Sequence, residues 1–206
     1  MSVLSTSVSR YDLLLQKINK PYKAFLYDCD GTLADNMQAH KDAYVKVAAQ
    51  HNIVLDPALI EELAGWPSLQ VIEEINKRYN AQLDPMAFAT LKSALFFDEY
   101  IEHTKPIDYV VQHLKAHAGI EKIAVVSGGS RRTVNKTLTV LGILPLVDEL
   151  VCAGETPNGK PFPDPFLRAA ELLGVAPEDC LVFEDGEPGV ASAVAAGMDW
   201  IRVDKI

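Results

Sequence analysis

Five short apolar runs, separated by stretches with helical spacing, constrain the fold of this chain more than any other feature. The first run, Ala24–Tyr27, stops abruptly at Asp28. A continuous apolar run that ends at a turn signal is typical of a strand buried on both faces, as in a parallel sheet. Comparable runs recur at Ile123–Val126, Leu150–Ala153, Cys180–Phe183 and Trp200–Val203.

The stretches between these runs are predicted to be helices. Alternating strands and helices are typical of a doubly wound α/β fold with a parallel sheet. Asp164 is expected to be the N-cap of one of these helices, with Pro165 as its first residue. The helices are expected at about Tyr109–Ala118, Arg132–Leu141, Pro165–Leu173 and Gly189–Ala196.

The segment from about residue 36 to residue 105 breaks this alternation and is predicted to be wholly helical. Asp56 and Asp84 each precede a proline, which predicts an N-cap followed by the first helical residue. Gly65 is a candidate helix stop, and Ser68 is expected to cap the helix that follows. The chain is therefore expected to contain an N-terminal helical arm (1–21), an α/β core (22–35 and 106–206) and an inserted helical cap (36–105).

The overall charge limits the partners that this chain is expected to have. Its 28 acidic and 19 basic residues give a formal net charge of −9, which repels nucleic acids at long range. No run approaches eighteen apolar residues, and the N-terminus lacks the pattern of a secretory signal, so no membrane association is expected. Three widely spaced cysteines favour reduced thiols in the cytoplasm. No feature indicates a protein partner.

Chemically reactive residues follow the predicted strands, at the edge where open α/β sheets bind their ligands. Asp28 and Asp30 follow the first strand, and two carboxylates at this spacing suit a nucleophile and a proton donor. An ordinary acidic turn is the alternative. Glu184 and Asp185 end another apolar strand, where adjacent acids are costly without a cation; such oxygen ligands suit Mg²⁺.

Two further loops carry candidates for anion binding. Ser127 and Gly128 precede a predicted helix, so a hydroxyl and free backbone N–H groups form a small anion cradle. Lys160 lies in a loop stiffened by three prolines, and a fixed ammonium offsets charge on a phosphoryl group. A plain loop and a solvated surface lysine are the respective alternatives.

Together, these four loops resemble the haloacid-dehalogenase superfamily over about residues 22–203. The signature DxDGT appears at residues 28–32, the serine of the second motif is Ser127, and the lysine of the third is Lys160 within GKPFPDPF. Glu184-Asp185 matches the acidic fourth motif. The surrounding residues, including Gly189, are similar to the β-phosphoglucomutase-like branch, in which a small helical cap closes over the site.

The resemblance implies a role for each matching residue. Asp28 would attack phosphorus, and Asp30 would protonate the leaving oxygen and then activate water. Mg²⁺ would be held by Asp28, Asp185 and the backbone carbonyl of Asp30. Glu184 would either bind the ion directly or contact one of the groups that bind it. The phosphoryl oxygens would contact three residues: Ser127, Gly128 through its N–H, and Lys160.

Departures from the branch pattern favour a phosphatase over a mutase. Asp35 and His40 match the mutases, but no Arg follows Gly65, and the comparable stretch of the last cap helix, 96–100, has no Lys. Hydrolysis needs one phosphate site plus water, whereas a mutase must hold a bisphosphate in two orientations. We therefore expect a Mg²⁺-dependent phosphatase of small sugar or polyol phosphates, with a β-phosphoglucomutase-type enzyme as the alternative; Lys92 and Arg131 count against this preference.

Two other functional classes fit less well. The dehalogenases of the superfamily lack the second acid, because an ester intermediate needs no protonated oxygen leaving group, and Asp30 is present here. A non-enzymatic protein on this fold is expected to have lost one of Asp28, Asp30, Lys160 or Asp185, and this chain keeps all of them.

Overall fold

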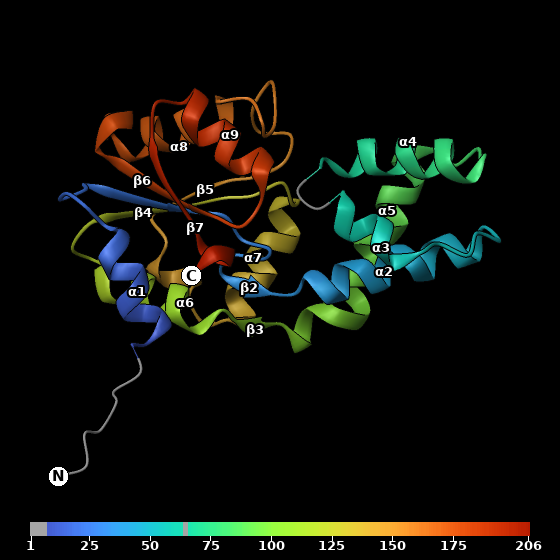
Figure 1. The fold of residues 1–206 in the computed structure, drawn as a ribbon, viewed down its shortest axis with the longest axis horizontal. Coiled ribbons are helices and arrows are strands. Elements are labelled where there is room, and N and C mark those ends of the chain that lie inside the picture. The colour runs from blue at the N-terminus through green and yellow to red at the C-terminus, as the bar shows by residue number, and fades with distance from the viewer. Residues whose placement is uncertain (1–7, 64–65) are drawn as a thin grey trace, which may run out of the picture.

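A five-stranded parallel sheet forms the centre of the larger part of the molecule (Figure 1). The computed structural model describes residues 8–63 and 66–206. The sheet order is β5-β4-β1-β6-β7, so β1 lies in the middle, between strands that come much later in the chain. The strands are β1 Ala24–Tyr27, β4 Lys122–Val126, β5 Glu149–Val151, β6 Cys180–Glu184 and β7 Asp199–Arg202.

All five predicted strands are confirmed, with small changes at their ends. Tyr27 pairs in parallel with Val125 on β4 and with Phe183 on β6, so these three strands end at the same edge of the sheet. β7 begins one residue earlier than predicted and ends at Arg202, because Val203 starts a 3-10 turn (η5, Val203–Lys205). This shared edge is where the reactive loops begin.

Helices cover both faces of the sheet. One hydrophobic cluster joins β1 to α1, α6 and α7, and a second lies under α8 and α9. The predicted N-cap at Asp164 is wrong: α8 begins at Asp164 itself after Pro163, and the Asp164 carboxylate accepts a hydrogen bond from the Asn158 side chain at 3.1 Å. The helices are α1 Arg10–Lys17, α6 Asp108–His117, α7 Arg131–Val140, α8 Asp164–Leu173 and α9 Glu187–Ala195, with short 3-10 turns η3 Leu144–Leu146 and η4 Pro177–Asp179.

The inserted segment folds as a separate group of helices beside the sheet, with its own hydrophobic cluster (Figure 1). The N-caps at Asp56 and Asp84 are confirmed, since their carboxylates accept from the N–H groups of Ala58 and Ala87, both at 2.9 Å. The expected cap at Ser68 is wrong, because this residue is already the first of its helix. The elements are α2 Met37–Gln50, α3 Pro57–Glu62, α4 Ser68–Tyr79, α5 Pro85–Leu95, the π-helix η1 Phe96–Tyr100 and the 3-10 turn η2 Ile101–His103. The expected stop at Gly65 lies outside the described residues.

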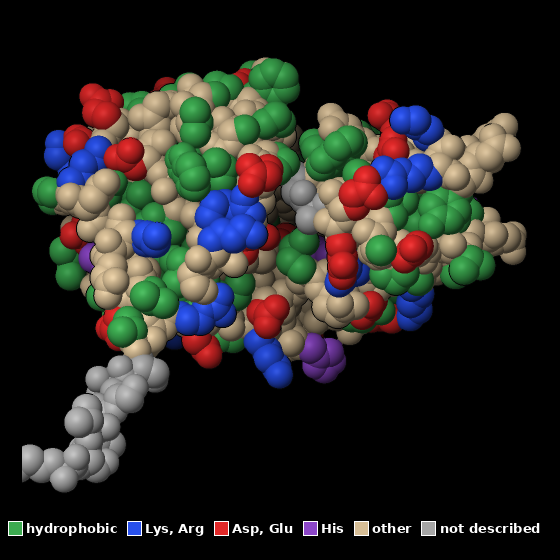
Figure 2. All heavy atoms as spheres, in the orientation of Figure 1, with side chains coloured by type: hydrophobic (Ala, Val, Ile, Leu, Met, Phe, Trp, Pro, Cys, Tyr) green, Lys and Arg blue, Asp and Glu red, His purple; other side chains and the backbone are tan. Residues whose placement is uncertain are grey.

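Two short antiparallel strands connect the sheet to these helices. β2 (Ala34–Asp35) pairs with β3 (Lys105–Pro106), so the chain leaves the core and returns to it at one place. This ribbon was not predicted. We propose that the helices between the two strands form the cap expected for residues 36–105. On the face shown in Figure 2, the surface is hollowed where the sheet and these helices meet. Within the described ranges, no helix is long and apolar enough to cross a membrane.

Candidate active site

Lys160 links the loops at the carboxyl edge of the sheet. Its Nζ donates to Asp28 Oδ1 at 2.7 Å, to Glu184 Oε1 at 2.6 Å and to the backbone oxygen of Val126 at 2.8 Å. These partners lie at the ends of β1, β6 and β4. Residues far apart in the sequence therefore meet around one ammonium group, which is itself almost completely buried.

Three carboxylates gather beside this lysine. Oxygen atoms of Asp28, Glu184 and Asp185 all lie within 4.8 Å of one another. The second oxygen of Glu184 faces the backbone N–H groups of Asp185 and Gly186, at 3.1 and 3.3 Å. Asp185 accepts from the Thr32 hydroxyl at 3.3 Å. Sequence analysis named all three acids, and the structure brings them together.

Two glycines make room for these acids. Gly31 has φ +88°, a left-handed conformation that favours glycine, and a Cβ there would lie 2.2 Å from Asp185 Oδ2. Gly189, in the first turn of α9, contacts the Glu184 side chain so closely that a Cβ would lie 1.9 Å from its carboxyl carbon. The backbone of Gly31 therefore packs directly against the Asp185 carboxylate, and that of Gly189 against the Glu184 carboxylate.

The charges of this cluster do not balance. Burial raises the pKa of Asp28 and Asp185, and it raises that of Glu184 to about 7, with neighbouring carboxylates adding to the effect. Burial would lower the pKa of Lys160, but Asp28 and Glu184 raise it overall. One ammonium thus faces three acids. A divalent cation bound between the acids would balance them, and hard oxygen donors are the ligands that Mg²⁺ prefers. The donor set therefore fits this ion.

The carboxylate of Asp30 turns away from this cluster toward the start of α2. Its Oδ1 accepts a hydrogen bond from Asn36 Nδ2 at 2.5 Å, and its Oδ2 lies 3.4 Å from His40 Nε2. Burial alone would raise the pKa of Asp30, but the His40 ring and the Asn36 amide outweigh it and hold that pKa at about 2. Asp30 and Asp28 thus have different hydrogen-bond partners, and their pKa values are shifted in opposite directions.

The inserted helices supply a cation to this region. Lys92 on α5 lies 2.7 Å from His40 Nδ1, and the ring of Phe96 stacks on His40 with centroids 4.0 Å apart. Burial lowers the pKa of Lys92 to about 8. The stretch 96–100, where the mutases are expected to carry a lysine, forms the π-helix η1 and has none. Lys92, one turn earlier, instead contacts His40 beside Asp30.

The anion cradle predicted after β4 lies next to Asp30. Ser127 Oγ accepts from the Gly129 N–H at 3.0 Å, and a Cβ on Gly129 would lie 3.7 Å from Asp30 Oδ2. Gly128 is exposed. Arg131 was a candidate for binding a second phosphate. It forms an ion pair with Glu155 and donates to the backbone oxygen of Leu150 at 2.8 Å.

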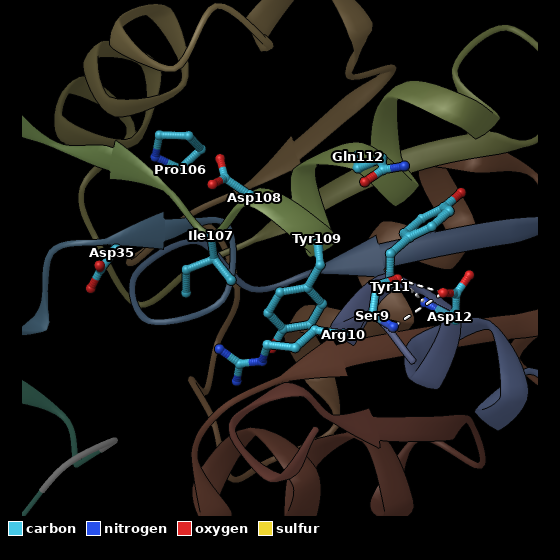
Figure 3. A pocket seen from close by; sticks show the side chains of 10 residues that line it. All are labelled: Ser9, Arg10, Tyr11, Asp12, Asp35, Pro106, Ile107, Asp108, Tyr109 and Gln112. Carbon is cyan, nitrogen blue, oxygen red and sulfur yellow. Dashed lines mark hydrogen bonds between the residues drawn. The ribbon is translucent and has the colours of Figure 1, made fainter. Parts of the chain in front are cut away.

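A separate pocket lies between α1, α6 and the β2–β3 ribbon (Figure 3). It has a volume of about 620 Å³. Two of its polar side chains are engaged: Arg10 lies over the Tyr109 ring at 4.6 Å and donates to the backbone oxygen of Ile206, and Asp12 bonds Ser9. None of the site residues predicted from the sequence lines this pocket.

The sequence did not mark Asn36 as a site residue, and it marked Lys92 only as a residue that counts against a phosphatase. Asn36 resembles an ordinary helix N-cap residue in the sequence, so nothing marked its side chain as a partner of Asp30. The signal for Lys92 was its position four residues before Phe96, since both side chains then lie on the same side of a helix.

Comparison with known proteins shows which family of enzymes this chain is similar to. A family model described as haloacid dehalogenase-like hydrolase matches residues 22–197. The chain is 31% identical over 182 residues to the fructose-1-phosphate phosphatase YqaB of Escherichia coli, covering 88% of this chain and 96% of that protein. It is 33% identical over 190 residues to hexitol phosphatase A of Escherichia coli, covering 88% and 83%.

A mutase and a solved structure are also similar. The β-phosphoglucomutase of Bacillus subtilis is 29% identical over 185 residues, covering 85% of this chain and 80% of that protein. The crystal structure of CbbY from Rhodobacter sphaeroides in complex with phosphate has a TM-score of 0.77 at 21% identity, covering 87% of this chain and 84% of that one. At this identity, the structural likeness shows the fold alone.

Proposed function

The chain belongs to the haloacid dehalogenase-like hydrolases, and we propose that it is a Mg²⁺-dependent phosphatase that hydrolyses small sugar or polyol phosphates through a phosphorylated Asp28. The general activity, hydrolysis of phosphoric monoesters, agrees with the family model and with relatives named as phosphatases. The observation that carries the proposal is the contact of Lys160 with both Asp28 and Glu184, with Asp185 beside them.

The proposed substrate class rests on the relatives. Two proteins that are at least 31% identical to this chain are named for fructose 1-phosphate and for hexitol phosphates. Both match nearly nine-tenths of this chain, so the similarity includes the inserted helices as well as the sheet. A cap that closes over the site restricts it to small molecules.

Asp28, Glu184 and Asp185 would hold Mg²⁺, together with the backbone carbonyl of Asp30. When bound, the ion neutralises charge on the phosphoryl oxygens and aligns them for in-line displacement. Lys160 supplies a second positive charge from the protein itself, and its three hydrogen bonds keep the ammonium in a fixed position. Fixed charges of this kind need no rearrangement during the reaction.

The protein's own residues account for both chemical steps. A carboxylate oxygen of Asp28 forms a bond to phosphorus while the bond from phosphorus to the ester oxygen breaks, and Asp30 gives its proton to that oxygen. Asp30 then takes a proton from the water that attacks phosphorus, and the bond to Asp28 breaks. A phosphoryl dianion beside Asp30 raises the pKa of its carboxyl by like-charge repulsion, which allows the acid to carry a proton when substrate is bound. Ser127 and the Gly128 N–H would hold the phosphoryl oxygens.

A sugar-phosphate mutase is the second candidate, and His40 with Lys92 is the observation that favours it. Both residues lie beside Asp30 on the inserted helices, and the Bacillus subtilis mutase is similar over most of the chain. However, Lys92 is buried against His40, and Arg131 is engaged by Glu155. Neither cation is free to hold a second phosphate, so we retain the phosphatase as the proposal.

Phosphate release from a panel of sugar and polyol phosphates tests this proposal. We expect turnover of fructose 1-phosphate or a hexitol phosphate with Mg²⁺, loss of turnover with EDTA, and loss in the Asp28→Asn variant. The Arg131→Gln variant should keep its activity. Full activity in Asp28→Asn would refute the nucleophile, and conversion of β-glucose 1-phosphate to glucose 6-phosphate without phosphate release would establish the mutase instead.

A further inference from the structure

Asn36 occupies the N-cap position of α2, but its side chain does not cap the helix. Asparagine is among the preferred N-cap residues, because its side-chain oxygen accepts from a free N–H of the first turn. Here, within the described part of the chain, the side chain makes no such bond to α2. It turns instead toward the nucleophile loop, where Nδ2 donates to Asp30 Oδ1 at 2.5 Å.

This arrangement has two costs to stability, which are set against the hydrogen bond to the buried Asp30 carboxylate. The first turn of α2 loses the hydrogen bond that an asparagine at this position ordinarily supplies. In addition, Asn36 is only 3% exposed, and its Oδ1 has no hydrogen-bond partner among the residues that the structure describes. A buried carbonyl oxygen without a donor is unfavourable. The contact with Asp30 is therefore the one favourable polar interaction that the structure records for this side chain among the described residues.

The contact does determine how the Asp30 carboxylate lies. The amide nitrogen of Asn36 can donate but not accept, and the unprotonated oxygen of a carboxylic acid is the better acceptor. The contact with Oδ1 therefore favours Oδ2 as the oxygen that carries a proton on Asp30. That oxygen lies between the His40 ring, whose Nε2 is 3.4 Å away, and the loop after β4, where a Cβ on Gly129 would lie 3.7 Å from it.

We propose that Asn36 is a positioning residue for the acid–base step. It holds Oδ1 of Asp30 so that Oδ2, on the side of the phosphate-binding loop, carries the proton to the leaving oxygen. This inference rests on the proposed function, since it takes Asp30 as the acid. A serine at this position would place its oxygen one bond closer to the backbone, about 1.5 Å short of the Asn36 nitrogen, but within reach of the first turn of α2.

The test compares substrates that differ in their need for the acid. An alkyl phosphate from the panel above needs protonation of its leaving oxygen, whereas p-nitrophenyl phosphate releases a stable anion. We expect Asn36→Ser to lower kcat/KM for the alkyl ester by about 10- to 100-fold and for p-nitrophenyl phosphate by less than about threefold. Asn36→Ala should show the same contrast.

Thermal unfolding separates positioning from folding. We expect the Tm of Asn36→Ser to change by less than about 4 °C, because the serine caps α2 while the hydrogen bond to the Asp30 carboxylate is lost. A matched control is Ser9→Ala, which removes the N-cap of α1 on the far side of the core. It should lower Tm by about 2–4 °C and leave the ratio of the two kcat/KM values as in the wild type.

The outcomes are distinguishable from failure of the proposed function. Equal losses of kcat/KM on both esters in Asn36→Ser, or no loss on either, overturn the positioning role. A fall in Tm of more than about 4 °C also overturns it, since the amide would then serve mainly folding. Undiminished turnover by Asp28→Asn overturns the proposed function itself, whatever the Asn36 variants do.

Discussion

Acid should destabilise this protein through His113, a fully buried histidine beneath the central strand. His113 on α6 is 0% exposed, and its Nδ1 lies 2.8 Å from the hydroxyl of Tyr27. The rings of Phe25 and His117 pack against it, with centroids at 4.8 and 4.3 Å. Burial, with a contribution from His117, lowers the pKa of His113 from 6.5 to about 3.

The direction of the effect follows from proton binding. Below pH 6.5 the unfolded chain protonates this histidine, whereas the folded protein keeps it neutral down to about pH 3. The unfolded state therefore binds the extra proton, and the contribution of neutral His113 to stability is complete above pH 6.5 and declines as the pH falls. At pH 4.5, two pH units below the unfolded pKa, the loss is about 3 kcal/mol, or roughly 6–12 °C in Tm for a chain of this size.

Calorimetric unfolding between pH 7.5 and 4.5 in EDTA measures this loss. The quantity of interest is the difference between wild type and His113→Leu, because the pH dependence of other groups is common to both. Tyr27→Phe is the matched control, since it removes the hydroxyl and keeps the histidine. We expect His113→Leu to be less stable than wild type at pH 7.5 and to lose roughly 6–12 °C less on acidification. Equal losses in the two proteins would refute the reasoning.

Two further substitutions test individual contacts. A Cβ in Gly189→Ala would lie 1.9 Å from the carboxyl carbon of Glu184, so that carboxylate must move. We expect the Mg²⁺ affinity, measured by calorimetry, to fall by about 10- to 100-fold. The control variant Gly159→Ala, whose Cβ would meet open space, should keep its Mg²⁺ affinity. Lys92 has a folded pKa of about 8 against 10.5 unfolded, so its charge opposes folding at neutral pH. Lys92→Met should therefore raise Tm at pH 7 but not at pH 10.5, while lowering turnover; a lower Tm at pH 7 would contradict this.

The parts of the fold that could be predicted are those set by local sequence. The strands could be found because both faces are buried, which requires an uninterrupted apolar run such as Ala24–Tyr27. The β2–β3 ribbon could not, since each strand has two residues and one contains Pro106; it exists because the chain enters and leaves the insert at one point. The π-helix that begins at Phe96 was not predicted either; the ring of Phe96 stacks on His40, a contact between residues far apart in the sequence.

The site residues that could be predicted from the sequence are those that lie at the ends of buried strands. Asp28, Glu184 and Asp185 come directly after buried strands, so sheet topology alone brings them together. The contacts of Asn36 and Lys92 were not predictable, because they depend on how the inserted helices sit over the first loop. An asparagine before a helix predicts a cap, and only the coordinates show that its amide turns to Asp30 instead.

Trapping the phosphorylated enzyme tests the central claim most directly. Rapid acid quench of the enzyme with phosphate-labelled substrate and Mg²⁺, followed by peptide mapping, should place the label on the peptide that contains Asp28. The label should accumulate in Asp30→Asn, with a leaving group that needs no acid, and be absent from Asp28→Asn. Turnover without any label on the protein, or a label that persists in Asp28→Asn, would contradict the account.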